Sequence, residues 1–283
     1  MPDIPFKTGI PKTIFQIFLQ GGEFPEGVEE NIQNIKSLNP DWDYEIYDLA
    51  RAEEFIKDHY GPDILAYFRR IDPSYQAVRA DLLRYLLCYA LGGVYLDLKS
   101  TVTRPLCEIV LPEDEFILTQ WAALKDVWPR PGQHTEVWHI KGGEFCNWTV
   151  ISAKGHPFLK AVIAACLENI DAYRPFKDGV GRKAVFRLTG PVAYTLAIDA
   201  IRDSHPNRMA ILEEDGFVFS IYGDVFRHRK VMGAHYANQY KPVIVRPLLE
   251  DAFTRAYFGS IYPLSKRVKD ALIKALRVLT GSK

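Results

Sequence analysis

Hydrophobic and polar residues follow two different periods along this chain. Apolar residues recur every three or four positions in several segments, which is the period of a helix with one buried face. Between these segments lie short apolar runs rich in β-branched and aromatic residues, which predict strands. The predicted helices are 28–38, 52–59, 74–91, 157–169, 190–202 and 264–283, and the predicted strands are 13–19, 44–47, 94–99, 116–121, 149–151, 208–212, 218–221 and 231–235. Because helices and strands alternate, we expect an α/β fold in which helices cover a central sheet.

The predicted strand 94–99 and the helix before it carry several charged groups. Side chains alternate along a strand, so one face of this strand would be aliphatic and the other would carry Tyr95, Asp97 and Lys99. Asp81 and Arg84 are three residues apart and therefore lie on one face of the helix. Burying an unpaired charge is costly, so these groups either form local ion pairs or meet a ligand at the edge of the sheet. The residue types alone leave both interpretations open.

The composition is that of an ordinary soluble chain. Of the 283 residues, 48% are hydrophobic and 25% are charged, which excludes the disordered and fibrous classes. The 35 Lys and Arg residues balance 35 Asp and Glu residues, which argues against a general nucleic-acid binder. The 4 cysteines are too far apart for a C-x-x-C metal or redox motif, so we expect reduced thiols.

The balanced total conceals a basic C-terminal segment. Residues 264–283 contain six Lys or Arg and one acid, so this segment carries +5 and the remainder of the chain carries −5. Its apolar residues form a stripe beside these Lys and Arg residues. Such a helix would either bind an anionic membrane surface or dock on the domain. We divide the chain into a domain over 1–260 and a basic amphipathic helix over 261–283. The sequence shows no secretory segment and no apolar run long enough to span a membrane, so we expect a cytoplasmic protein. Its C-terminal helix is a candidate for peripheral contact with the inner membrane.

The segment 79–99 contains R-A-D-L-L-R-Y and then G-G-V-Y-L-D-L-K. It resembles the signature of glycosyltransferase family 32, which is R-x-D-x-x-R followed by G-G-x-Y-x-D-x-D. Similar flanking motifs occur in the expected order at 10–18, 145–158, 189–191 and 233–240. The resemblance implies a GT-A fold, a Rossmann-like single domain whose central mixed sheet is flanked by helices. It also implies a retaining transferase that moves a hexose from a UDP- or GDP-sugar to a hydroxyl of a glycan or lipid-linked glycan, as in capsule and lipopolysaccharide synthesis.

The resemblance also implies roles for residues at matched positions. Phe18 would stack on the nucleobase, and Tyr95 would line the nucleotide. Asp81 and Arg84 would hold the donor sugar and its diphosphate, because an arginine fork suits phosphate oxygens. The remaining donor-binding residues would be Asp97, His235, Gln239 and Tyr240. The catalytic set would be Arg84, Asp97, Lys99 and Asn147.

Tryptophans are concentrated in the segment 120–148, between the predicted strand 94–99 and the Asn147 match. Trp121, Trp138 and Trp148 are candidates to bind the acceptor, because sugar rings stack on indoles. The other interpretation is a small aromatic core that pins a long loop.

One position departs from the family signature. Lys99 stands where the second Asp of D-x-D would ligate Mg²⁺ or Mn²⁺, and an ammonium group cannot ligate a cation. Three hypotheses follow. Lys99 itself neutralises the diphosphate in a metal-independent enzyme, or a metal binds through Asp97 and His235. The third hypothesis is a non-catalytic nucleotide-sugar or glycan-binding module.

Overall fold

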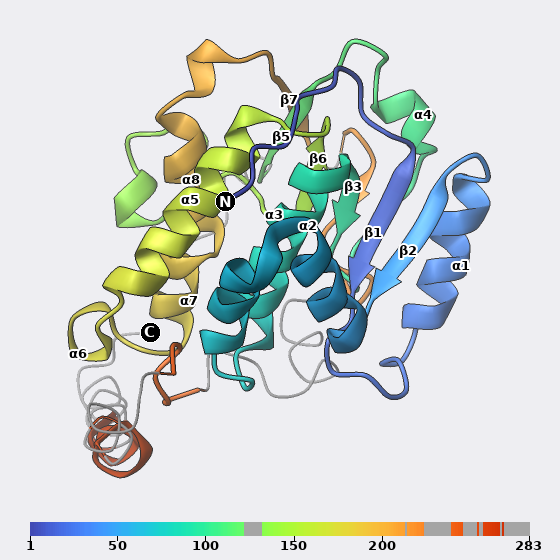
Figure 1. Ribbon diagram of the computed structural model, residues 1–283. Coiled ribbons are helices and arrows are strands. Elements are labelled where there is room, and N and C mark those ends of the chain that lie inside the picture. The colour runs from blue at the N-terminus through green and yellow to red at the C-terminus, as the bar shows by residue number, and fades with distance from the viewer. Residues whose placement is uncertain are drawn as a thin grey trace, which may run out of the picture.

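A mixed sheet lies at the centre of the fold. The computed structural model describes residues 1–121, 132–212, 214–223, 239–245, 254, 257–266 and 268. Within them, six strands form the sheet in the order β2-β1-β3-β6-β5-β7 (Figure 1). β1 is parallel to β2 and β3, β6 is antiparallel to β3 and β5, and β7 is parallel to β5. These strands are β1 Thr13–Ile17, β2 Asp43–Tyr47, β3 Gly93–Leu96, β5 Phe116–Gln120, β6 Thr149–Ser152 and β7 Arg208–Ile211.

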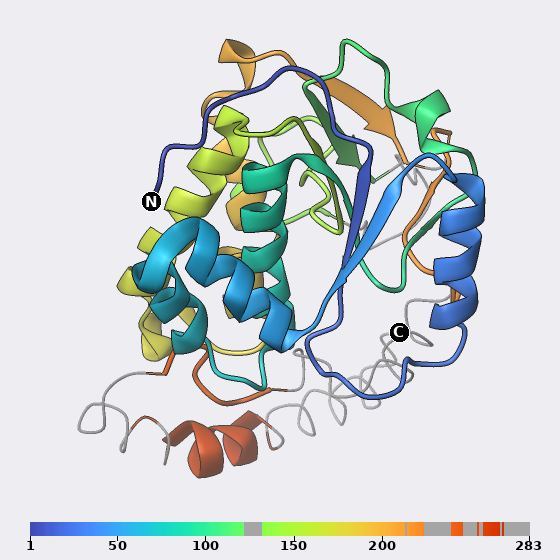
Figure 2. The same ribbon diagram turned by 45° about the vertical axis from the view of Figure 1, so that its right-hand side comes forward.

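Helices cover both faces of this sheet (Figures 1 and 2). Phe15 and Tyr95 point from one face into a core shared with α2, α3, α5, α7 and α8. Ile14 and Val94 point from the other face into a core shared with α1, α4 and a small antiparallel sheet of β4 Thr101–Val102 and β8 Phe217–Val218. The helices are α1 Val28–Leu38, α2 Leu49–Arg70, α3 Gln76–Leu91, α4 Leu106–Ile109, α5 Pro157–Ala172, α6 Pro175–Asp178, α7 Arg182–Leu188 and α8 Pro191–Asp199. The predicted α/β architecture is confirmed.

Two glycines connect the buried helix α3 to β3. Gly92 ends α3 with φ 74°, and Gly93 opens β3 with φ 110°, which is backbone that other residues rarely adopt. A Cβ on Gly93 would lie 2.6 Å from the carbonyl oxygen of Thr13 in β1. The glycine pair therefore allows α3 to turn directly into a strand that lies close against β1.

Gly93→Ala is expected to lower the free energy of unfolding by about 2 kcal/mol or more, because strained backbone and a steric clash add together. Gly22→Ala is the matched control, since Gly22 has φ 81° but its Cβ would meet open space. Urea denaturation of both variants measures the difference. Equal destabilisation by the two substitutions would contradict the close approach of β3 to β1.

The strand predicted over 94–99 and the helix predicted over 52–59 have other bounds in the structure, which also contains the short elements α4, α6, α7 and β4 that the sequence did not predict. The strand predicted over 94–99 ends at Leu96, because Ser100 N–H donates to the carbonyl of Asp97 and closes a turn over 97–100. The helix predicted over 52–59 continues in α2 to Arg70, with a kink at Gly61. Pro62 resumes the helix there, because proline is well tolerated in a first turn.

The C-terminal predictions fall mostly outside the described residues. Of the predicted helix 261–283, the structure describes only 261–266 and 268, and the predicted strand 231–235 is not described. The domain boundary at 260 therefore stays a prediction. Among the described helices, none combines the length and the apolar composition that a membrane span needs.

Candidate functional site

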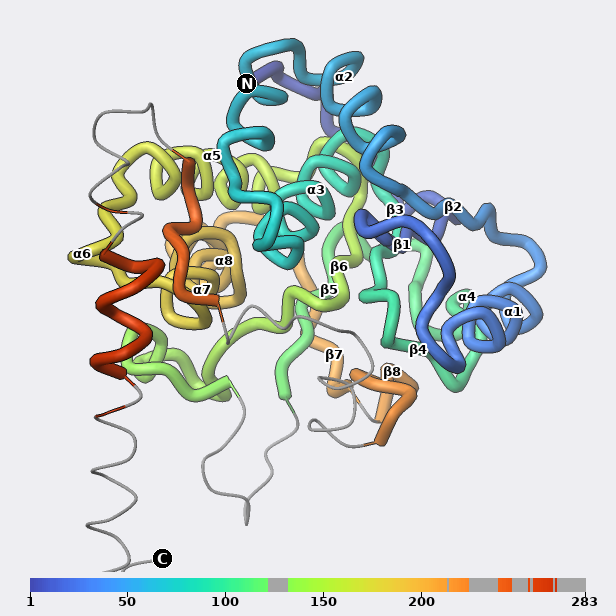
Figure 3. Tube along the Cα trace, turned by 90° about the horizontal axis from the view of Figure 1, so that it is seen from below, coloured from blue at the N-terminus to red at the C-terminus, as the bar shows by residue number. Residues whose placement is uncertain are grey.

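Asp97 and Lys99 follow directly after the end of β3. Figure 3 views the fold from below, with β3 between β1 and β6. Asp97 N–H donates to the carbonyl of Trp148 at 2.8 Å, and the Gln16 side chain donates to the carbonyl of Asp97 at 3.1 Å. These bonds tie the turn to the start of β6 on one side and to β1 on the other. The two charged side chains are therefore held by the backbone turn and not by strand alternation.

Arg84 lies buried between two carboxylates. Its guanidinium is 3.1 Å from Asp81 Oδ1 and 3.1 Å from Asp97 Oδ1. It also donates to the carbonyl of Asn147 at 2.5 Å and covers the ring of Tyr95 at 4.6 Å. The i,i+3 pair expected on the helix thus extends across the fold to the turn after β3. One cation joins the two carboxylates of the predicted donor site.

Asp97 is held in its ionised form. Tyr95 donates to Oδ1 at 2.9 Å, and Lys99 Nζ lies 2.5 Å from Oδ2. Burial alone would raise the pKa of Asp97, but the charges of Lys99 and Arg84 and these hydrogen bonds lower it below its ordinary value. Lys99 is nearly buried, with its ammonium 4.3 Å from the ring centre of Phe219. The turn therefore presents an anion flanked by two fixed cations.

The pKa of Asp81 is shifted in the opposite direction to that of Asp97. Its carboxylate accepts hydrogen bonds from Asn147 Nδ2 and Thr189 Oγ1, each at 3.1 Å. Asn147 Nδ2 also donates to the Tyr85 hydroxyl at 2.8 Å. Burial raises the pKa of Asp81 to about 7, although Arg84 and the two hydrogen bonds oppose the shift. Asp81 can therefore change its charge near neutral pH.

Asp81→Asn is expected to change how stability depends on pH. An aspartate with a pKa of about 7 when folded and an ordinary value of 3.8 binds more protons in the folded state. Its contribution to the free energy of unfolding therefore falls as pH rises through that window, and the uncharged variant lacks this fall. Urea denaturation of both proteins between pH 4.5 and about 7.5 measures the difference. The same dependence of stability on pH in wild type and Asp81→Asn would contradict the raised pKa of Asp81.

A cavity of about 170 Å³ brings most of the predicted site together. Its lining includes the predicted donor and catalytic residues Asp81, Arg84, Asp97, Lys99 and Asn147. It also includes the predicted acceptor residues Trp121 and Trp148. Glu144, which sequence reasoning missed, lines the same cavity. Only the Gly142-Gly143 pair before it, which indicates a tight turn, is visible in the sequence.

Other predicted residues lie apart from this cavity or outside the described chain. Phe18 packs on Phe24, with ring centres 5.1 Å apart, beside the apolar cluster that contains Leu98. Trp138 is 86% exposed and does not line the cavity. Tyr240 contacts Tyr262 and Lys266. The described contacts give Gln239 no partner in the cavity, and His235 is not described, so the roles of these residues stay predictions.

The groups around Asp97 do not fit a divalent cation. Both carboxylate oxygens already bind Tyr95, Arg84 or Lys99, and the two cations would repel a metal. Within the described residues, no group of three or more His, Cys, Asp and Glu side chains converges as a metal site. His235, the other predicted ligand, lies outside those residues. We therefore assign no chemical step to a metal.

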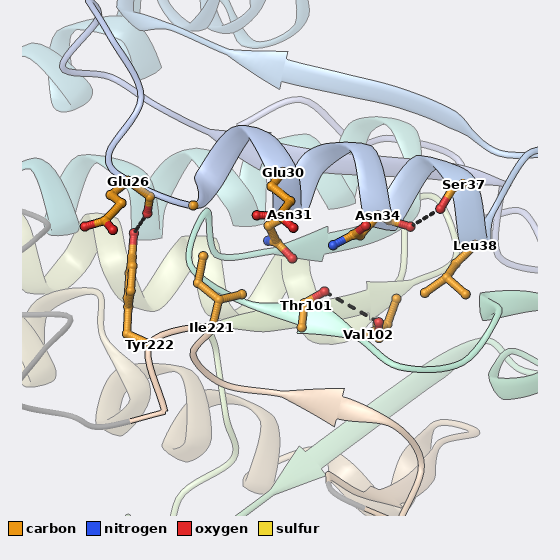
Figure 4. A pocket seen from close by; sticks show the side chains of 11 residues that line it. Glu26, Glu30, Asn31, Asn34, Ser37, Leu38, Thr101, Val102, Ile221 and Tyr222 are labelled. Carbon is orange, nitrogen blue, oxygen red and sulfur yellow. Dashed lines mark hydrogen bonds between the residues drawn. The ribbon is translucent and has the colours of Figure 1, made fainter.

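A second, larger groove lies between α1 and β4 (Figure 4). Its volume is about 650 Å³, and its lining mixes polar side chains such as Asn31 and Asn34 with apolar ones such as Ile221. The Tyr222 hydroxyl closes one end by donating to the carbonyl of Glu26 at 2.9 Å. None of the residues predicted for donor, acceptor or metal lines this groove, so we place the candidate site in the smaller cavity.

One region of the chain matches a protein-family model, and it contains or borders the turn, the buried ion cluster and the cavity. Residues 25–117 match the family model described as the glycosyltransferase sugar-binding region containing a DXD motif. The match includes α3, β3 and the turn after it. The resemblance drawn from R-x-D-x-x-R and G-G-x-Y-x-D-x-K is thereby confirmed, and Lys99 is a departure within that region.

Two of the curated relatives that the chain matches are fungal enzymes. The initiation-specific alpha-1,6-mannosyltransferase of Candida albicans is 28% identical over 163 residues, which are 54% of this chain and 42% of that protein. The mannosyl phosphorylinositol ceramide synthase of Saccharomyces cerevisiae is 38% identical over 106 residues, which are 37% of this chain and 27% of the synthase. This chain therefore spans less than half the length of these two relatives.

A solved structure shares the fold at low sequence identity. The ligand-free glycosyltransferase domain of the YGT toxin superposes with a TM-score of 0.51 at 9% identity, covering 72% of this chain and 81% of that domain. This likeness confirms the predicted GT-A fold, with its central mixed sheet flanked by helices.

Proposed function

We propose that this chain is a glycosyltransferase that moves a hexose from a nucleoside-diphosphate sugar to a hydroxyl of a glycan or lipid-linked glycan. The observation that carries this proposal is the division of one cavity into two chemical halves. Arg84 and Lys99 flank Asp97 and offer fixed positive charge to a diphosphate, whereas Asp81 and Asn147 offer carboxylate and amide groups to sugar hydroxyls. The mannosyltransferase relatives support the transfer of a sugar. A UDP-bound domain with the same fold supports the nucleotide donor.

The reaction that we propose retains configuration at the anomeric carbon. The bond between this carbon and the diphosphate oxygen breaks, and the acceptor oxygen bonds to the same carbon from the same face. The acceptor proton passes to the leaving phosphate oxygen. Lys99 and Arg84 stabilise the negative charge that develops on the diphosphate, and because they are already fixed by Asp97, they need little reorganisation during the reaction.

The names of the relatives suggest which substrates to test first. Both curated relatives are mannosyl-transferring enzymes, and one name includes a phosphorylinositol ceramide. We therefore infer that GDP-mannose is the first donor to test, with UDP-sugars beside it. Assembly of a surface polysaccharide at the cytoplasmic face of a membrane, with the basic segment 261–283 as a peripheral contact, is part of the same proposal.

Nucleotide release from a panel of GDP- and UDP-sugars tests the proposal, with and without EDTA. We expect release from at least one donor, and faster release when glycan acceptors are added. Asp97→Asn should remove this activity, while the surface control Asp171→Asn should retain it. Measurable binding of a nucleotide sugar without release from any donor would support the non-catalytic binding module instead.

A further inference from the structure

Glu144 is a buried carboxylate in the cavity that the proposed donor site does not use. It is 5% exposed, and its backbone N–H donates to the carbonyl of Gly132 at 2.9 Å. Gly142 and Gly143 precede it with φ 91° and 83°, and this backbone turns the carboxylate toward the cavity. Trp121 Nε1 donates to Glu144 Oε1 at 2.9 Å and fixes the side chain from one side.

The second oxygen of this carboxylate lacks a hydrogen bond. Oε2 is buried, and among the described residues it has no hydrogen-bond partner. His134 Nε2 lies 3.0 Å away, close enough for an ion pair with Oε2 when the imidazole is protonated, but it forms no hydrogen bond with this oxygen. A buried acceptor without a hydrogen bond is costly, so a ligand in the cavity that supplies a donor would stabilise this oxygen.

The cavity wall next to Glu144 suits the flat face of a sugar. The rings of Trp121 and Trp148 lie 5.0 Å and 5.5 Å from the ring of Phe219, and all three residues line the cavity. Trp148 Nε1 is also buried without a hydrogen-bond acceptor among the described residues. One unpaired acceptor and one unpaired donor beside an aromatic wall match hydroxyl groups, which both donate and accept.

We propose that Glu144 Oε2 accepts a hydrogen bond from a hydroxyl of a pyranose bound against Trp121 and Trp148. This inference rests on the proposed sugar-transfer function, and it names Glu144 as a specificity-determining residue of that site. The pyranose is either the hexose of the donor or the sugar of the acceptor. Both present the same hydroxyl chemistry to this carboxylate.

Isothermal titration calorimetry with Glu144→Gln tests the proposal without requiring turnover. The probes are UDP against UDP-glucose, GDP against GDP-mannose, and the free glycosides methyl α-D-mannopyranoside and methyl α-D-glucopyranoside. The matched control is Glu136→Gln, because Glu136 lies on the same segment but pairs with Arg187 and does not line the cavity. Thermal denaturation first shows that both variants are folded.

We expect wild type and Glu136→Gln to bind a saccharide probe alike, and Glu144→Gln to bind it about 10-fold or more weakly. If Glu144→Gln lowers the affinity for a nucleotide sugar but not for its free nucleotide or for a free glycoside, the hydroxyl belongs to the donor hexose. If a free glycoside loses affinity, the hydroxyl belongs to the acceptor. Affinities of Glu144→Gln within twofold of wild type for every probe would overturn the proposal, as would a wild type that binds no saccharide. Saccharide binding that depends on Glu144 without transfer from any donor would refute only the proposed function.

Discussion

Arg84→Met is expected to lower the free energy of unfolding by about 3–5 kcal/mol and to abolish binding of the nucleotide sugar. Arg84 is the buried cation that joins Asp81 and Asp97, at 3.1 Å from each. Its removal leaves two carboxylates buried without their shared counter-charge, which costs far more than the loss of a surface ion pair. Urea denaturation and titration with GDP-mannose and UDP-glucose measure the two effects.

The stability loss of Arg84→Met should shrink at acidic pH. Protonation neutralises the carboxylates that have lost Arg84, so the variant approaches wild type as pH falls. Arg187→Met is the control, because Arg187 forms a partly exposed ion pair with Glu136 and its loss should cost about 1 kcal/mol or less. A stability loss for Arg84→Met that equals the control at every pH would contradict the central role of this cation.

Lys99→Ala is expected to weaken nucleotide-diphosphate binding and to slow donor turnover by about 100-fold or more. Lys99 is the cation that stands where the family has a metal-ligating Asp, and it is fixed against Asp97 at 2.5 Å. Wild-type binding and turnover should be unchanged by EDTA, because the charge comes from the chain. Lys99→Asp recreates D-x-D and should recover turnover only when Mn²⁺ or Mg²⁺ is added.

The control for these substitutions is Lys160→Ala, which removes a surface lysine that pairs with Asp3. It should leave both affinity and EDTA insensitivity unchanged. Wild-type turnover that EDTA abolishes would refute the replacement of the metal by Lys99. It would favour the hypothesis in which Asp97 and His235 bind a metal.

The sequence predicted the central unit of the fold closely. The spacing of apolar residues placed α1 over Val28–Leu38, and Gly92 marked the end of α3. Alternation in β3 also placed Val94 on one face of the sheet and Tyr95 on the other. It failed at Asp97, because the alternation of polar and apolar residues continues unchanged through the turn that ends β3. Only the hydrogen bond from Ser100 N–H to the carbonyl of Asp97 distinguishes a turn from a continuing strand here.

The candidate site divides in the same way. The sequence by itself determined the family's sugar-binding region, because its charged residues are close along the chain, at 79–99, and have a recognisable spacing. Only the tertiary structure decided that Trp121, Glu144 and Trp148 share one cavity with Asp97, whereas Trp138 is exposed. The physical reason is that β6 is antiparallel to both β3 and β5, so the ends of three strands distant in sequence meet at one edge. Such pairing depends on packing across the whole sheet, and no local pattern of residues encodes it.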